Sequence, residues 1–390
     1  MHACVRPRAE RRALRAQEHD AEELDAVYAR GLYLKTEEGQ AESWNVRSRE
    51  VMTQLALGVG LFLMNNFSGE CALVYYSIEI IGMAGFASEG AIAQAIVNIG
   101  ACATAGVLIG FFLIDRIGRR RLITISGIGT SLSLFLLAAS FVLADSRSPG
   151  VVPPLSSMSE EACGIGGVTT CAGCLDVACS FCGLPYEGPG QPTPGFCLTR
   201  EGLPNAARDA CSATTPPVNV TASYTLYRQG CPSGYGWLSM LALCAFQFWF
   251  QLGLGIVPAA VNAEYDPNSV RGLCNGSAVA LSWLGNFCVS STFLSLTSVL
   301  GSPRLFCINA TCVAIGTLLM LFFLPETCGL SFVEIQALFK LYGKPGSPPP
   351  WALWEHMVSL REAEGGPSAS PSPRRGTTPA SERELFRPVV

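Results

Sequence analysis

Six long runs of the chain contain no Asp, Glu, Lys or Arg, and each is close in length to a helix that crosses a membrane. An α-helix needs roughly 20 apolar residues to span a hydrocarbon layer of about 30 Å. A buried helix of a large soluble protein is the alternative for any one run, but runs that repeatedly end in charges, Gly or Pro favour a bilayer. We therefore predict an all-α membrane protein with six transmembrane helices, at residues 51–69, 91–114, 122–144, 236–263, 273–300 and 305–324.

The segment DRIGRRRL, residues 115–122, indicates how these helices are oriented. It joins the second and third runs with four arginines in a few residues, and short loops rich in Lys and Arg stay in the cytoplasm. Counting spans from this loop puts residues 1–50 inside and residues 145–235 outside. Within the inner N-terminal segment, residues 10–30 are rich in Ala, Leu, Glu and Arg and precede Gly31, which predicts a surface helix.

The outer segment, residues 145–235, is rich in cysteine, and four of its cysteines have the spacing C-x2-C-x4-C-x2-C. A four-thiolate zinc site normally separates its two C-x2-C pairs by far more than four residues, and an iron-sulfur cluster needs a reducing compartment. We predict disulfides rather than a metal site, with a pairing that the sequence leaves open. Asn219 begins an N-x-T sequon, which predicts glycosylation. The cysteines expected in disulfides are Cys163, Cys171, Cys174, Cys179, Cys182, Cys197, Cys211 and Cys231.

Two further segments follow the last predicted span. Residues 325–344 contain Ser331 and Glu334 at the spacing of a capping box, which predicts a short cytoplasmic helix. Residues 345–390 are rich in Pro, Ser and Arg, and this composition predicts a disordered tail.

The polar residues of the spans suit binding better than catalysis. All three histidines lie outside the spans, so we expect no enzyme, no cofactor, no metal and no nucleic-acid partner. Amides beside aromatic rings suit a polyhydroxylated solute, although the same amides could instead join helices by hydrogen bonds. The candidate solute-binding residues are Asn65, Asn66, Tyr75, Tyr76, Trp283 and Asn286, and Glu70 is a candidate proton or charge site.

Several motifs in a fixed order resemble those of the sugar porters of the major facilitator superfamily. They are DRIGRR at residues 115–120, E-x2-P-x3-RG from Glu264 and PETxGLxFxE from Pro325. NNFSGECALVYYS and SWLGNF resemble the seventh-helix and eleventh-helix motifs of that family. The cysteine-rich insertion is similar to that of the inositol transporters, which include the proton myo-inositol cotransporters. The resemblance covers residues 48–341 and likens the six spans to the C-terminal half of the fold, with a disulfide-rich outer insertion.

This resemblance implies a sugar or inositol transporter of the plasma or vacuolar membrane, working by proton-coupled symport and alternating access. In such a fold the solute lies between two six-helix halves, and only one half is seen here, so we expect a truncated chain or a partner half. A non-transporting receptor or scaffold that uses the cysteine-rich module is the alternative. The resemblance also implies a charged gate that closes the inner face. Its residues would be Asp115, Arg116, Arg119, Arg120, Glu264, Arg271 and Glu326.

The sequence departs from the family pattern at the expected solute site. Asn65 and Asn66 stand where the family has two glutamines, and Glu70 and Cys71 stand where it has Ile and Asn. Ala259 replaces a tryptophan that would offer a stacking surface. Each lost polar or stacking contact is worth on the order of 1 kcal/mol, so these changes predict weakened or redirected binding.

Overall fold

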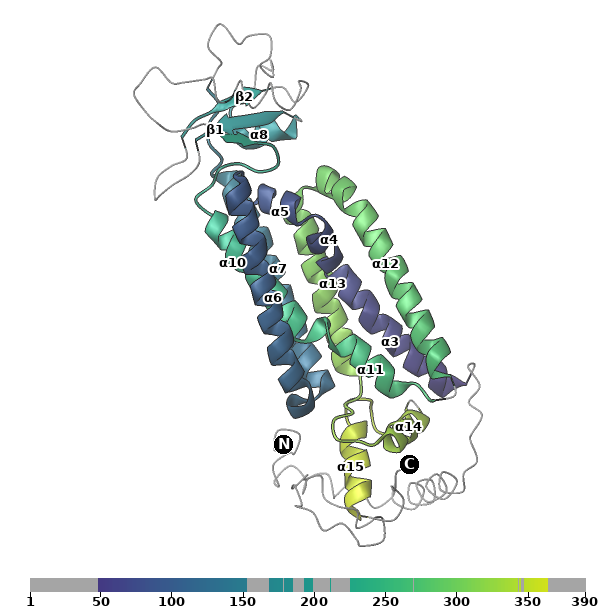
Figure 1. Cartoon of the computed structure of the whole chain (residues 1–390). Helices are drawn as coiled ribbons and strands as arrows, with labels where there is room; N and C mark the ends of the chain where they lie inside the picture. Colours follow the sequence, from purple (N-terminus) through teal and green to yellow (C-terminus); the bar gives the residue numbers. More distant parts are fainter. Residues whose placement is uncertain are drawn as a thin grey trace, which may run out of the picture.

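A bundle of long helices makes up most of the protein (Figure 1). The computed structural model describes residues 48–152, 168–177, 179–184, 193–198, 211, 225–268, 270–342, 344 and 347–363. A small β-sheet lies beyond one end of the bundle and two short helices lie at the other end. We call the end that carries Arg119, Arg120 and Arg121 the inner end.

Within the described residues, five stretches are long and apolar enough to cross a membrane. They are α6 (Glu89–Ile117), α7 (Arg119–Ser146), the stretch Gly236–Tyr265, α12 (Arg271–Leu300) and α13 (Ser302–Phe323). The stretch Gly236–Tyr265 is not one regular helix, because α10 (Gly236–Trp249) passes through the π-helix η1 (Phe250–Leu254) into α11 (Val257–Tyr265). The predicted spans other than the first therefore coincide with five candidate membrane helices.

The first predicted span corresponds to α3 (Arg49–Phe67), a helix of 19 residues that packs against α12 and is not among the five. The chain continues through two short helices, α4 (Glu70–Tyr75) and α5 (Ser77–Met83). Gly69 separates α3 from α4 with φ 85°, a left-handed conformation that favours glycine. The count of six spans thus stays a prediction, because this segment is a broken helix.

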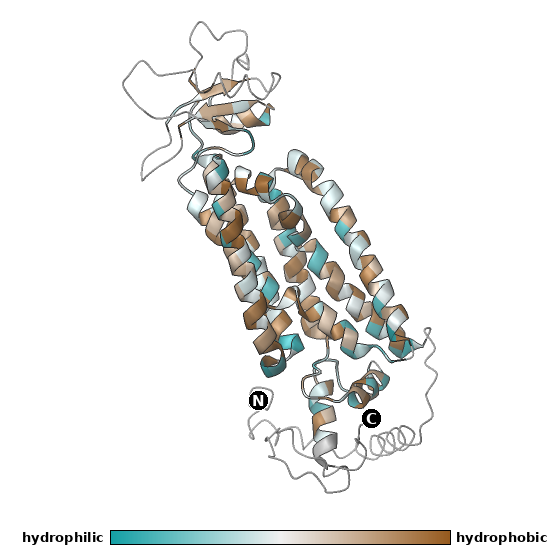
Figure 2. Cartoon of the chain, viewed as in Figure 1, coloured by the Kyte–Doolittle hydropathy of each residue, from teal (hydrophilic) through white to brown (hydrophobic). Residues whose placement is uncertain are grey.

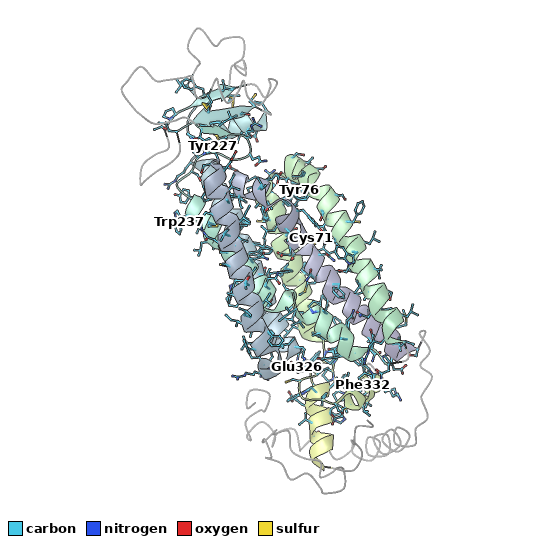
Figure 3. All side chains as sticks on the ribbon, viewed as in Figure 1. Cys71, Tyr76, Tyr227, Trp237, Glu326 and Phe332 are labelled. Carbon is cyan, nitrogen blue, oxygen red and sulfur yellow. A yellow bond between two sulfur atoms is a disulfide. The ribbon has the colours of Figure 1, made fainter. Side chains whose placement is uncertain are left out.

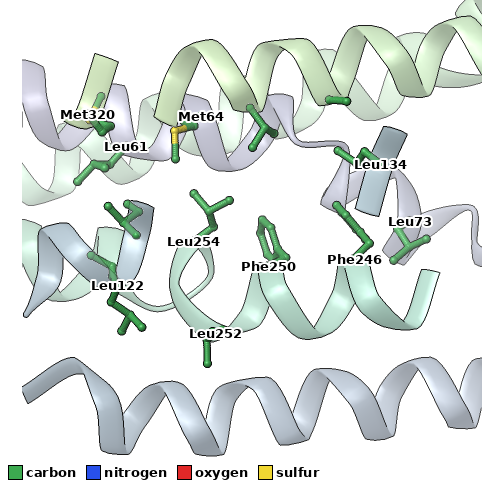
Figure 4. Packing of buried hydrophobic residues seen from close by; sticks show 14 of the residues in the cluster. Leu61, Met64, Leu73, Leu122, Leu134, Phe246, Phe250, Leu252, Leu254 and Met320 are labelled. Atoms are coloured by element: carbon green, nitrogen blue, oxygen red, sulfur yellow. The ribbon is translucent and has the colours of Figure 1, made fainter. Parts of the chain in front are cut away.

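The centre of the bundle is where α7 packs against α13 and α10. Figure 4 shows Phe246, Phe250 and Leu254 on one side of α10 and η1, whereas Leu252 points to the opposite side. All four side chains are buried in one apolar cluster that also draws on α3, α7 and α13. Through these residues α10 and η1 contact helices on two sides.

The flanking helices α6 and α12 keep much apolar surface exposed. Phe111 and Phe112 on α6 are 69% and 68% exposed, and Phe287 and Val299 on α12 are 68% and 79% exposed. Figure 2 shows hydrophobic residues along the whole length of the long helices. Apolar area of this extent requires cover by lipid or protein, and the chain is an integral membrane protein.

The outer segment folds, in its described part, around a three-stranded antiparallel sheet with strand order β2-β1-β3. The strands are β1 (Ser180–Gly183), β2 (Phe196–Leu198) and β3 (Thr225–Tyr227), and the short helix α8 (Cys171–Asp176) precedes them. The described disulfides join Cys171 to Cys231, Cys174 to Cys197 and Cys182 to Cys211. Cys179 is disulfide-bonded as well. Cys171, Cys174 and Cys182 thus bond to distant cysteines, as a disulfide framework requires.

Some predictions fall on residues outside the described ranges. These are the helix at residues 10–30, the pairing of Cys163 and the glycosylation of Asn219. They stay predictions.

Two helices, α14 (Phe332–Leu341) and α15 (Leu353–Ala363), lie at the inner end (Figure 1). Ser331 and Glu334 form the predicted capping box of α14. The disorder predicted from residue 345 is wrong for α15, because Leu353 and Met357 are buried in the core cluster. The prediction used the average composition of residues 345–390, and the few apolar residues of α15 change that average very little.

Candidate functional site

The predicted inner gate is centred on Arg119, at the start of α7. Its guanidinium lies 2.9 Å from Glu264 Oε1 at the end of α11 and 3.0 Å from Asp115 Oδ1 at the end of α6. Thr327 Oγ1 donates to the other oxygen of Glu264 at 3.3 Å. Because Arg119 is 15% exposed in its side chain, the pair with Glu264 is shielded from water and stronger than an ordinary surface ion pair.

The Glu326 carboxylate contacts backbone N–H groups at the same helix end. Its two carboxylate oxygens accept from the N–H groups of Arg119 at 3.1 Å and Arg120 at 3.2 Å, which begin α7. They also accept from the N–H groups of Thr327 at 3.0 Å and Cys328 at 3.1 Å. Gly118, the N-cap residue of α7, offers no side chain. Glu326 therefore caps α7 from a distant loop and places a negative charge at the positive end of the helix.

The other predicted gate residues make different contacts. Arg271 Nε donates to the backbone oxygen of Asp266 at 3.3 Å, and its guanidinium lies 5.1 Å from the centre of the Phe332 ring. Arg120 donates to the backbone oxygens of Leu321 and Trp351. Arg116 lies in the last turn of α6. The structure thus brings Asp115, Arg119, Glu264 and Glu326 into one network, whereas Arg120 and Arg271 reinforce its edges.

Asp266, in the turn after α11, adds a buried carboxyl to the inner end. Asp266 as a whole is 2% exposed. Burial raises the pKa of Asp266 to about 6, and the positive charge of Arg271 opposes this rise.

We expect Asp266 to make the protein less stable as pH rises from about 4 to about 6, because the unfolded chain releases this proton first. The effect is on the order of 2 kcal/mol. Asp266→Asn should therefore be more stable than the wild type at pH 7 and equal to it near pH 4. Thermal unfolding of both proteins in detergent at several pH values measures this, and parallel profiles would contradict it.

In this structure the predicted solute-binding amides join helices. Asn65 Nδ2 donates to the backbone oxygen of Leu254 at 2.9 Å, in η1. Asn66 is 2% exposed, and its Nδ2 donates to the backbone oxygen of Ser282 on α12 at 3.0 Å. Cys71 Sγ lies 3.3 Å from Asn66 Oδ1. The amide of Asn66 is fully engaged, as the interhelical alternative predicts.

The predicted aromatic residues of the site are dispersed. Tyr76 stacks on Phe293 with ring centres 5.5 Å apart, and its hydroxyl donates to the backbone oxygen of Ser290 at 3.0 Å. Tyr75 and Trp283 are 55% and 64% exposed, on faces that the bundle leaves open. Figure 3 shows Tyr76 and Cys71 on neighbouring segments near the outer end of the bundle. Asn286 Oδ1 accepts from Ser290 Oγ at 3.4 Å, which places it beside the contacts of Tyr76.

Two residues outside the predicted site hold this region. Ser126, fully buried on α7, donates to the backbone oxygen of Trp249 at 2.7 Å and accepts from the N–H of Leu254 at 2.9 Å. It thereby contacts one backbone group at each end of the π-helix η1 and fixes this segment to α7. Gln247 on α10 donates from Nε2 to Glu70 Oε1 at 2.8 Å. In the sequence, Ser126 lies in the small-residue stretch SGIGTS, residues 126–131, and Gln247 lies in the fourth predicted span, but neither pattern reveals the partner of its residue.

An interhelical polar network and a charged cluster at one end of a membrane bundle define a multispan membrane protein. The model of the family described as sugar (and other) transporter matches residues 7–226 and 210–339. The chain belongs to this sugar transporter family.

Among its curated relatives, the chain is 31% identical over 316 residues to probable inositol transporter 2 of Arabidopsis thaliana, covering 78% of the chain and 52% of the relative. It is 29% identical over 290 residues to the proton myo-inositol cotransporter of Homo sapiens, covering 73% and 44%. The chain spans about half the length of these relatives. A solved structure of the proton:xylose symporter XylE, of the major facilitator superfamily, aligns with TM-score 0.46 at 18% identity, covering 73% of the chain and 42% of that structure.

Proposed function

We propose that this chain is part of a proton-coupled transporter for a cyclic polyol or hexose that works by alternating access. Membership of the sugar transporter family and similarity to inositol transporters at about 30% identity support the solute class. The description of the human relative as a proton myo-inositol cotransporter supports proton coupling. The observation that carries the mechanism is the latch at the inner end.

The latch joins parts of the chain that are distant in sequence. Arg119 and Glu264 pair from α7 and α11, and Glu326 joins the loop after α13 to the start of α7. When these contacts close the inner end, the solute site can open only toward the opposite side of the membrane, as alternating access requires. Opening the inner end would require breaking these contacts, and its free-energy cost is that of losing a few ion pairs and hydrogen bonds. Such a latch is strong enough to bias the state and weak enough to release.

The proposed solute site lies where α3, α4 and α12 meet. Asn65, Asn66, Tyr76 and Asn286 supply amides and an aromatic ring there. Asn66 and Tyr76 would exchange an interhelical hydrogen bond for one to a solute hydroxyl, which is nearly neutral in energy when donor and acceptor are matched. We further propose that a second six-helix half completes the site and that the assembly resides in the plasma or vacuolar membrane.

A receptor or scaffold is the second candidate function. The observation in its favour is that the amides expected to bind solute are used within the bundle, while the outer sheet is braced by separate disulfides. In that case the helices would act as an anchor and the outer sheet would bind a partner.

Uptake measurements separate the two candidates. The chain would be expressed alone and fused to the first half of an inositol transporter relative, in cells that lack inositol and hexose uptake. We expect the fusion to accumulate labelled inositol or hexose and Arg119→Ala to reduce this at least about tenfold, because the latch is lost. Arg304→Ala, which removes an exposed arginine on α13, is the matched control and should retain uptake. Absence of uptake in the fusion, with capture of a defined protein by the outer segment, would favour the receptor.

A further inference from the structure

Glu70 and Gln247 form a buried pair that is joined by one hydrogen bond and leaves one oxygen of each side chain without a partner in the described structure. Glu70 is 9% exposed and Gln247 is 5% exposed. Gln247 Nε2 donates to Glu70 Oε1 at 2.8 Å. The second oxygen of each group, Glu70 Oε2 and Gln247 Oε1, is buried and has no hydrogen-bond partner within the described part of the chain. Both unpaired atoms are acceptors while Glu70 is ionised.

A carboxylate in this position has no ion-pair partner in the described part of the chain. The described ion pairs both involve Arg119 at the inner end, remote from α4. An unpaired buried charge costs several kcal/mol, and each unsatisfied buried acceptor costs about 1–3 kcal/mol. Ionised Glu70 would therefore be the least favourable state of this pair.

A single proton removes both defects. A proton on Glu70 Oε2 neutralises the carboxylate and changes this oxygen from an acceptor to a donor. If Gln247 Oε1 accepts this proton, the acid and the amide share two hydrogen bonds in a ring. The proton comes from solvent, and the only covalent bond that forms is O–H.

We propose that Glu70 and Gln247 together form a proton-binding site, with the proton held on Glu70 Oε2 and accepted by Gln247 Oε1. This inference deepens the proposed function, on which its link to solute transport rests, but proton binding itself does not require transport.

Among the residues that the structure describes, no charged side chain forms an ion pair with Glu70. Cys71 follows Glu70 on α4, and Cys244 lies one turn before Gln247 on α10. The elements packed against α4 are α3, α5 and α12. Their titratable groups are Arg49 and Glu50 in the first turn of α3, Glu79 on α5, and Arg271, Cys274 and Cys288 on α12.

The proton site is connected to the proposed solute site through short contacts. Ser68 Oγ accepts from the Glu70 N–H at 3.3 Å and donates to the Asn65 backbone oxygen at 2.6 Å. On the other side, Cys71 donates to Asn66 Oδ1. Gly69 provides the left-handed break between α3 and α4 at this point. Gain or loss of the proton would thus act on the break that positions both amides.

Infrared spectra of the purified full chain in detergent at neutral pH, without solute, test the proposal. The wild type should show the carbonyl band of a protonated carboxylic acid, and Glu70→Gln should lose it. Glu79→Gln, the same change on the neighbouring α5, is the matched control and should keep the band. A wild type without this band, or a Glu70→Gln protein that retains it, overturns the proposal.

A second variant covers the case in which Glu70→Gln does not fold. Gln247→Leu removes the donor to Glu70 Oε1, so the acid carbonyl band should move to higher wavenumber, and an unmoved band overturns the pairing. The readout is independent of uptake. If the band behaves as expected while the fusion fails to transport, the proton site stands and the proposed function falls. If uptake occurs while Glu70→Gln leaves the band unchanged, the proton site falls alone.

Discussion

Replacing Gly110 with alanine is expected to destabilise the bundle by about 2–3 kcal/mol, through overpacking between α6 and η1. A Cβ atom at Gly110 would lie inside van der Waals contact of the Leu252 backbone oxygen, and one at Gly106 would lie 2.5 Å from the Phe248 backbone oxygen. A backbone oxygen cannot rotate aside as a side chain can. Gly106 and Gly110 have the G-x3-G spacing that lets membrane helices approach closely. The thermal unfolding midpoint in detergent measures the loss.

The same helix offers a matched control at Gly100. No atom lies within 4 Å of a Cβ placed there. Gly100→Ala should be neutral or stabilise by up to about 1 kcal/mol, because alanine has the higher helix propensity. Gly110→Ala and Gly100→Ala are therefore expected to change the stability in opposite directions. Equal effects would mean that close packing does not hold α6 against η1.

Glu326→Ala should cost about 3 kcal/mol and loosen the inner end. The substitution removes an acceptor from four backbone N–H groups, two of which begin α7. Charge-assisted hydrogen bonds contribute roughly 1.5–3 kcal/mol each, and partial exposure of the carboxylate reduces the total. Thermal unfolding gives the stability, and faster amide hydrogen exchange at the start of α7 would localise the change.

Asp115→Ala is the control within the same network. The Asp115 side chain is 77% exposed and its described contact is one ion pair with Arg119, so its loss should cost at most about 0.5 kcal/mol. Glu326→Gln should fall between the two, because an amide keeps one acceptor oxygen but not the charge. If Asp115→Ala and Glu326→Ala were equally destabilising, the loss of one negative charge, and not the loss of the helix cap, would explain the lower stability.

The membrane character and the positions of the long helices could be read from the sequence, because both depend on short-range properties. A long apolar run predicts a span wherever its neighbours lie, and DRIGRR and the capping box of Ser331 and Glu334 depend on spacing alone. α3 is less clear from the sequence. Its polar residues and the break at Gly69 interrupt the apolar pattern, so the span count from the sequence is firm only for the five long stretches.

The roles of single polar residues depend on partners distant in sequence. Glu326 is predicted in a charged gate, and its hydrogen-bond partners also make it the cap of a helix that begins 206 residues earlier. Asn66 suited a ligand, and the structure directs its amide to α12. Gln247 and Glu70, which are 177 residues apart, gave no sign of pairing.

From hydropathy and cysteine spacing one can predict that the chain spans a membrane, where its long helices lie, and that its clustered cysteines form disulfides. The fold is needed to see which described cysteines pair, which amides join helices, and that Glu70 has no ion pair among the described residues. This difference arises because hydropathy and capping act over a few residues, whereas disulfides, hydrogen bonds between helices and desolvation depend on what the fold places next to each group.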